Sequence, residues 1–174
     1  MFRKLSGLFV FILFLSSNSM AADGLKIGVI DFKQFIDTSV VGKSIQKEIK
    51  DKGDQLKAEL DKMQTDLIKL QESYNREAPL WTKEQKQDKE KSLRIRINDF
   101  NNLKRKNEKE FNEFQINRIN GAKGNILEYA TNKAKKEGYY LIFEKQTGTI
   151  LYAHGSINIT DELIQEIDKS ANEK

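Results

Sequence analysis

Glu77-Ala78-Pro79-Leu80-Trp81 is the stretch that decides the fold, because it interrupts a long pattern that is otherwise helical. Pro79 is the single proline of the chain; its ring cannot continue a helix, and it biases Ala78 away from helical backbone angles. Thr82 follows as an expected helix N-cap, with Gln85 at capping-box spacing. One helix should therefore end before Pro79, and another should begin after Thr82.

The segments on either side of this turn carry apolar residues at spacings of three and four. If the numbers of facing residues sum to about 160, apolar residues meet in seven layers. The facing pairs are Leu67 with Leu93, Met63 with Ile97, Leu60 with Phe100, Leu56 with Leu103, Ile49 with Phe111, Ile45 with Phe114 and Val41 with Ile119. This seam predicts an antiparallel α-helical coiled-coil arm over residues 41–119. The arm should be roughly 55 Å long at about 1.5 Å per residue, and should therefore project from the rest of the chain.

Two places on the arm allow two interpretations each. Gly53 faces Asn107 in this pairing, and their layer has no apolar filler. The glycine is either a soft point at which the arm bends or a tolerated surface residue. At the tip, Leu80 and Trp81 have little cover from neighbouring residues. They either contact another molecule, or Trp81 packs on Tyr74 within the turn.

Residues 1–21 are expected to be a secretory signal peptide. Two basic residues precede an apolar run from Leu5 to Leu15, and small residues lead to a cleavage site that we place between Ala21 and Ala22. The alternative is a membrane anchor, but the run is shorter than the roughly 20 residues that a spanning helix needs. The chain contains no cysteine, so an exported protein of this sequence would be held together by packing alone.

Three short apolar runs outside the arm predict strands: Lys26–Asp31, Tyr139–Glu144 and Thr149–Ala153, the last two joined by a turn at residues 146–148. Residues 22–40 and 120–174 should thus form one small body, which makes the fold class α+β with a three-stranded sheet. So small a sheet is marginal alone, and we expect its apolar strands to pair with other copies of the chain in an oligomer. The residues expected in that oligomer interface are Ile27, Val29, Leu141, Phe143, Ile150 and Tyr152.

Short helical segments complete the predicted body. Residues 32–38 are expected to form a helical turn, after which Thr38 or Ser39 caps the first arm helix. Gly138 should end the second arm helix. Thr160 is the expected cap of a last helix over residues 161–171, whose first turn is acidic, as the helix dipole favours.

The charge of the chain is unevenly distributed. Residues 82–136 carry 15 basic and 8 acidic residues, whereas residues 139–174 carry 3 basic and 6 acidic residues. A basic helix is either a solvated face or a surface that attracts anionic lipid headgroups and acidic partners. The residues proposed for contact with a partner or lipid are Leu80, Trp81, Lys104, Arg105 and Lys106.

Nothing in the sequence predicts an enzyme, a cofactor or a metal site. The single histidine, His154, has no cysteine or second histidine to act with. Residues 121–124 are too short for a phosphate-binding loop and fall on a helix. Nucleic-acid binding is disfavoured by the expected export and by a charge of +2 for residues 22–174, which is +4 for the whole chain less Arg3 and Lys4.

The order of these features resembles the Skp (OmpH-like) periplasmic chaperones. The motifs that carry the resemblance are Ile27-Gly28-Val29-Ile30-Asp31, the charged helical hairpin, the run from Gly138 to Glu144, and the run from Ile159 to Ile164. The resemblance covers the whole chain after the signal peptide. It implies a homotrimer in which three strand bodies form a barrel and three arms surround a cavity. Some members of the family are also thought to contact lipopolysaccharide through basic residues.

The resemblance implies an ATP-independent holding chaperone of the periplasm, which binds unfolded outer-membrane β-barrel proteins and prevents their aggregation in transit. The alternative from the residues alone is an exported coiled-coil scaffold or envelope tether that binds one folded partner. The predicted strands argue against this alternative, because a pure scaffold needs no sheet. The range of bound proteins would discriminate between the two: many unfolded clients for a chaperone, one folded partner for a scaffold.

Overall fold

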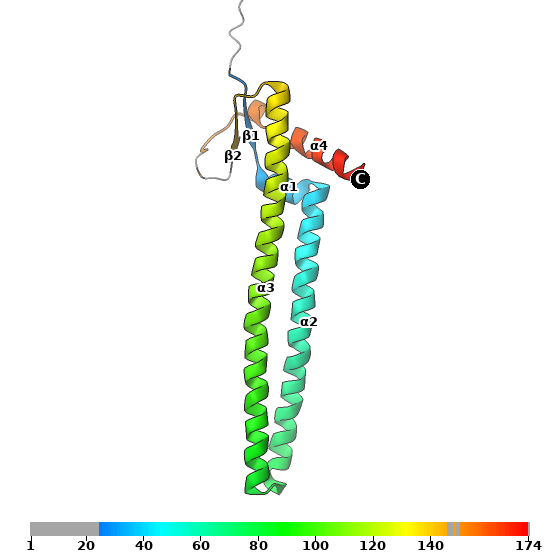
Figure 1. The fold of residues 1–174 in the computed structure, drawn as a ribbon, viewed down its shortest axis with the longest axis vertical. Coiled ribbons are helices and arrows are strands. Elements are labelled where there is room, and N and C mark those ends of the chain that lie inside the picture. The colour runs from blue at the N-terminus through cyan, green and yellow to red at the C-terminus, as the bar shows by residue number, and fades with distance from the viewer. Residues whose placement is uncertain (1–24, 146–147, 149, 174) are drawn as a thin grey trace, which may run out of the picture.

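The chain folds into a small body from which one long two-helix arm projects (Figure 1). The computed structural model describes residues 25–145, 148 and 150–173. The expected signal peptide, with its cleavage site at Ala21 and Ala22, lies outside the described residues. The described part is mostly helical with one two-stranded sheet, so the predicted combination of helical arm and small strand body is confirmed, whereas three strands are not found.

The arm consists of α2 (Val40–Glu77) and α3 (Lys83–Glu137), joined at the tip by the 3-10 turn η1 (Ala78–Leu80). The predicted capping box is present, because the Thr82 hydroxyl accepts from the backbone of Gln85 while the Gln85 side chain accepts from the backbone of Thr82. Gly138 ends α3 with a φ of 74°, a left-handed conformation that glycine adopts without strain. Local capping and turn chemistry therefore set the ends of both helices.

The register of the arm differs from the predicted one by about one helical turn. Contacting pairs have residue numbers that sum to 162–166 instead of about 160. These pairs are Lys52 with Glu110, Leu56 with Asn107, Gly53 with Phe111, Tyr74 with Glu90, and Glu48 with Arg118. Gly53 does not face Asn107; the ring of Phe111 lies against it, 3.2 Å from where a Cβ would be. The missing side chain of Gly53 makes room for this ring.

Strands β1 (Ile27–Ile30) and β2 (Leu141–Glu144) pair in parallel, with Ile27 opposite Leu141. The predicted strand at residues 149–153 is wrong, since residues 150–153 have no strand structure, and residue 149 lies outside the description. Its expected place is taken by a later segment: the backbone N–H of Ile159 donates to Val29 O at 3.0 Å, next to a bridge between Val29 and Asn158. Of the predicted turn at residues 146–148, only Gly148 is described.

The core of the body lies where α3 crosses the short helices α1 (Phe32–Thr38) and α4 (Thr160–Asn172). Its buried members are Phe35, Ile36, Ala122, Ile126, Ala130, Leu163 and Ile167. Ser39 is the N-cap of α2, as predicted, and its hydroxyl accepts from Gly42 N. Thr160 is not the cap predicted for α4; its hydroxyl accepts from Asp31 N at 2.8 Å and donates to Asn158, which ties α4 to the end of β1.

Candidate functional site

The described residues contain no cluster of His, Cys, Asp and Glu that could hold a metal ion. His154 instead caps the short 3-10 turn η3 (Gly155–Ile157), where its Nδ1 accepts from Ser156 N at 3.2 Å. The candidate functional surfaces are therefore those at which apolar or charged side chains remain without cover from the chain itself.

The first such surface is the outer face of the sheet. Side chains alternate between the faces of a strand, so Ile27, Val29, Leu141 and Phe143 share this face. Leu141 and Phe143 are about half-exposed there, whereas Val29 is 2% exposed and is already covered by the chain itself. Leu151 and Tyr152 lie beside it with 98% and 81% of their surface exposed. Together with Ile150 and Ile157, residues of this face line an open pocket of about 520 Å³. The structure thus gathers the predicted oligomerisation residues on one side of the body, although residues 150–152 are not in a strand.

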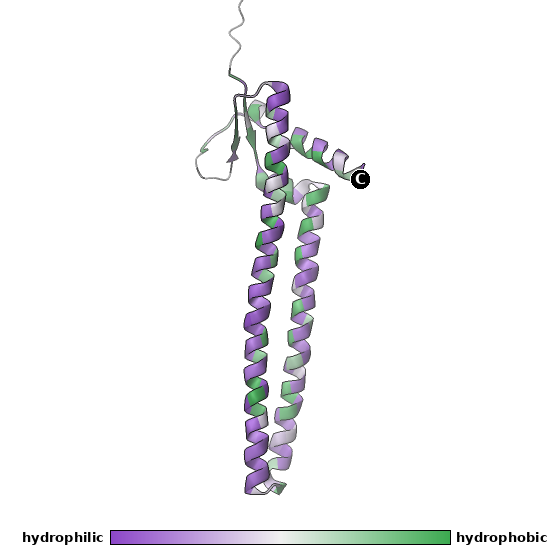
Figure 2. Ribbon diagram, viewed as in Figure 1, coloured by the Kyte–Doolittle hydropathy of each residue, from purple (hydrophilic) through white to green (hydrophobic). Residues whose placement is uncertain are grey.

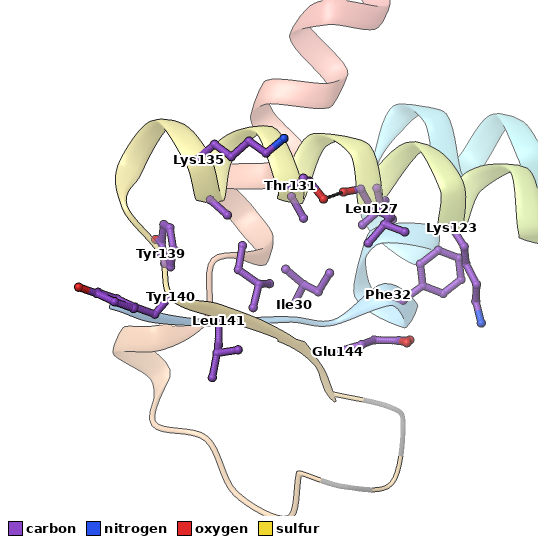
Figure 3. Close-up of a pocket in the computed structure, with 14 residues that line it drawn as sticks. Ile30, Phe32, Lys123, Leu127, Thr131, Lys135, Tyr139, Tyr140, Leu141 and Glu144 are labelled. Carbon is purple, nitrogen blue, oxygen red and sulfur yellow. Dashed lines mark hydrogen bonds between the residues drawn. The ribbon is translucent and has the colours of Figure 1, made fainter. Parts of the chain in front are cut away.

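The opposite face of the sheet forms a second pocket with α3, of about 500 Å³ (Figure 3). Ile30 points from the sheet toward α3, and Leu127 and Thr131 line the helical side. Lys123 and Lys135 stand toward its two ends, and the Lys123 ammonium lies 5.1 Å from the ring of Phe32. Sequence reasoning did not anticipate this pocket, because it needs the strand and the helix to be placed together.

The two helices of the arm consist mostly of hydrophilic residues, with apolar residues interspersed along both (Figure 2). The residues assigned to the seam are buried or half-buried, with the exception of Ile97, which is 41% exposed. Ile68, Ile95 and Ile116 lie outside the seam and are about half-exposed. The predicted seam residues are Ile45, Ile49, Leu56, Leu60, Met63, Leu67, Leu93, Ile97, Phe100, Leu103, Phe111 and Phe114. The arm therefore presents partly exposed apolar side chains among charged residues, and two of them, Ile68 and Ile97, line one shallow hollow with Leu67.

At the tip of the arm, Trp81 and Leu80 have different surroundings, although both were predicted as contact residues. Trp81 packs edge-on against Tyr74, with 5.3 Å between ring centroids, so the interpretation in which Trp81 packs within the turn is the one observed. The Tyr74 hydroxyl donates to Glu90 at 2.7 Å, and this hydrogen bond raises the pKa of Tyr74. Leu80 is 84% exposed and remains a candidate contact residue.

The basic run Lys104-Arg105-Lys106 lies exposed on the middle of α3. Arg105 donates to Asn102 at 2.6 Å within the same helix. Between these residues and the tip lies most of the distal arm, so the structure does not bring the basic run together with Leu80 and Trp81. The two groups are separate surfaces.

The burial of two polar residues on α3 was not predicted from the sequence. Asn107 is 4% exposed and donates to Leu56 O at 3.1 Å, which fills a layer of the seam. Lys133 has a side chain that is 4% exposed and lies near the carboxylates of Glu137, Glu162 and Glu166. Burial disfavours the charged form of Lys133, but hydrogen bonds to the three carboxylates outweigh this and raise its pKa. Single residues of these types on a charged helix give no local signal of burial.

The chain is similar to a known protein family in sequence and to a solved structure in fold. The family model for outer membrane proteins of the OmpH-like type matches residues 26–167. A crystal structure assigned to an outer membrane chaperone (OmpH-like) from Caulobacter crescentus has the same fold, with a TM-score of 0.76 and 14% sequence identity, over 83% of this chain and 85% of that chain. No curated protein matches the chain. Within the described residues, none of the helices has the length and apolar character needed to cross a membrane.

Proposed function

This chain belongs to the family of OmpH-like outer membrane proteins, and from that premise we propose that it is a holding chaperone for unfolded outer-membrane β-barrel proteins. The single observation that best supports this role is the arm, a long projecting hairpin on which half-exposed apolar residues stand among many charged residues. The OmpH-like chaperones are not enzymes, and they work in the periplasm. We therefore place the mature protein there, after removal of a signal peptide over residues 1–21.

The chaperone is proposed to act as a homotrimer joined through the sheet. A two-stranded sheet whose apolar outer face is only partly covered is too small to be stable alone. Phe143 is 43% exposed and Leu141 54% exposed on that face, and Leu151 is almost fully exposed beside it. Contact between three such faces would remove these side chains from water, and the three arms would then surround a common space.

Clients would be held by many weak contacts. Half-exposed residues such as Ile68, Ile95 and Ile116 can each touch an apolar side chain of an unfolded protein, while neighbouring charges keep the arms from associating with one another. Leu80 at the tip and the basic run at residues 104–106 are further candidate contacts, the latter also for lipopolysaccharide or another anionic lipid. Release would need no ATP, because each contact is individually weak and folding of the client into the membrane competes with them.

A light-scattering assay tests the proposed function. An unfolded outer-membrane protein, diluted from urea into buffer with an equal amount of the trimer, should remain soluble. Replacement of Ile68, Ile95 and Ile116 by serine should weaken this protection, because about half of each side chain is exposed and able to contact a client. A matched control replaces three exposed charged residues of the arm, Lys62, Lys69 and Lys91, by serine. Unchanged aggregation in the presence of the wild-type protein would exclude the holding function.

A further inference from the structure

Helix α4 lies across the root of the arm and carries acidic residues on both flanks of its apolar stripe (Figure 1). Leu163 and Ile167 form the stripe and are 2% and 4% exposed. Glu162 and Glu166 are four residues apart and thus share one flank, while Asp161 and Asp168 are seven residues apart and share another. The acidic charge of the C-terminal region is therefore arranged on two sides of one helix.

The first flank holds α3. The Lys133 ammonium lies 2.8 Å from Glu166 and 3.3 Å from Glu162, and it is buried between the two helices. Glu137, one turn further along α3, is a third partner at 2.6 Å. Because Lys133 is in the part of α3 that packs in the body, this contact fixes α4 to the body.

The second flank holds the start of the other arm helix. Both carboxylate oxygens of Asp168 lie 3.1 Å from the backbone N–H of Val40, the first residue of α2. An anionic group at this end of a helix also interacts favourably with the helix dipole. Asp161 accepts from the Gln34 side chain on α1 at 2.7 Å. Helix α4 thus contacts α1 and the start of α2 on one flank and α3 on the other, so it connects the two arm helices to each other.

The two helices of the arm join the body in different ways. In α3 the junction contains Gly121 and Gly124, and a Cβ at either position would meet nothing within 4 Å. Glycine lowers helix stability, so α3 bends more easily at these two positions than at an alanine, although Ala122 between them is 2% exposed and packs in the core. Helix α2 instead begins at a tight corner, where Ser39 is fully buried and a Cβ on Gly42 would lie 2.6 Å from Ile36 Cα. Both attachments pack against the core, but only the attachment of α3 contains glycines at which a Cβ would meet no other atom within 4 Å.

We propose that α4 is a brace that sets the orientation of the arm relative to the body, with Asp168 as a positioning residue and the glycine pair of α3 as the pivot. The glycine pair in α3 allows the angle between the arm and the body to change. The hydrogen bonds from the backbone N–H of Val40, in the first turn of α2, to Asp168 oppose that change. This inference rests on the proposed holding function, in which the direction of the arms defines the space for the client.

Distances between two spin labels test the brace without any client. The chain has no cysteine, so labels attach only where one is introduced. Gly155 suits the body label, because a Cβ there meets nothing within 4 Å, and exposed Lys62 suits the arm label. Labelled chains are mixed with excess unlabelled protein, so that only distances within one chain are read.

The Asp168→Asn variant should raise the population of displaced arms about fivefold, because it removes the charge that holds α2. The matched control is Asp66→Asn, which removes an exposed acid on α2 outside the root and should leave the distances as in the wild type. Gly121→Ala/Gly124→Ala should narrow the distance distribution, because alanine stiffens the helix and has room at both sites.

Two results would overturn the brace. One is an Asp168→Asn protein with native circular dichroism and wild-type distances. The other is a Gly121→Ala/Gly124→Ala protein whose distribution of label distances equals that of the wild type. This second result would exclude the glycine pair as the pivot even if Asp168→Asn unfolds the body. A failure of the holding function would instead appear as aggregation of the client with wild-type protein, which the distance measurement does not involve.

Discussion

Replacement of the buried Lys133 by methionine should lower the stability of the protein in a manner that depends on pH. Methionine keeps most of the length and apolar volume of the lysine stem, so little packing is lost. The ammonium and its three charge-assisted hydrogen bonds disappear, and three carboxylates remain close together without a cation. Those carboxylates are 31–61% exposed and keep much of their hydration. We therefore expect a loss of about 2 kcal/mol at pH 7, below the cost of a fully buried unpaired charge.

The pH dependence follows from two pKa shifts. The pKa of Lys133 is raised in the folded protein, so its contribution to stability is complete below its unfolded pKa and is lost only in strongly basic solution. Hydrogen bonds from Lys133 and Lys26 lower the pKa of Glu137. The contribution of Glu137 is therefore present above its usual pKa of 4.5 and is lost as the pH falls through its lowered folded value. The difference between wild type and Lys133→Met should shrink as the pH is lowered from 7 toward 3.

Urea unfolding followed by circular dichroism measures this difference, at one fixed protein concentration so that the proposed self-association affects all variants equally. Lys135→Met serves as the matched control, since Lys135 is exposed on the same helix turn and should leave stability nearly unchanged. The reasoning fails if Lys133→Met is as stable as wild type at pH 7, or if the difference between them is the same at pH 7 and pH 3.

Three further outcomes are expected. Phe143→Glu places a charge on the outer face of the sheet, so the mass measured by light scattering should fall from about three chains to one; an unchanged mass would exclude that face from the interface. Gly42→Ala should destabilise the fold by about 2 kcal/mol or more, because its Cβ meets the backbone of α1. Gly121→Ala should instead stabilise the fold by up to about 1 kcal/mol. Melting temperatures equal to that of the wild type would contradict both expectations. Thr82→Ala removes the capping box and should speed hydrogen exchange of the first turn of α3, with Thr65→Ala as control.

The ends of the arm helices could be predicted because their signals are local. Pro79, the Thr82 capping box and Gly138 act through neighbouring residues, and each does in the structure what its type predicts. The register could not be predicted in the same way. Apolar residues recur every three or four positions on both helices, so a shift by one turn again places apolar residues opposite one another. The body decides between the alternatives, because Val41, Ile45 and Ile119 pack against its core.

Features that depend on distant parts of the chain were not predictable from local patterns. The run at residues 150–153 has strand-forming side chains, but a strand also needs a free edge, and residues 158–159 occupy that edge of β1. The hydrogen bond from the backbone N–H of Val40 to the Asp168 carboxylate joins residues that are 128 positions apart in the sequence. An aspartate in the last helix is by its type an ordinary surface residue, and only the fold shows that it faces a helix N-terminus.

The parallel pairing of β1 with β2 has a consequence for the order in which the molecule forms. The two strands are separated by roughly 110 residues, and the whole hairpin lies between them. Contacts within the hairpin near its tip are close in sequence and can form early, whereas the first strand has no partner until the second has been made. In a chain made from its N-terminus, the arm can therefore form before β2 exists. The sheet, and with it the oligomer interface proposed above, forms only when the chain is nearly complete.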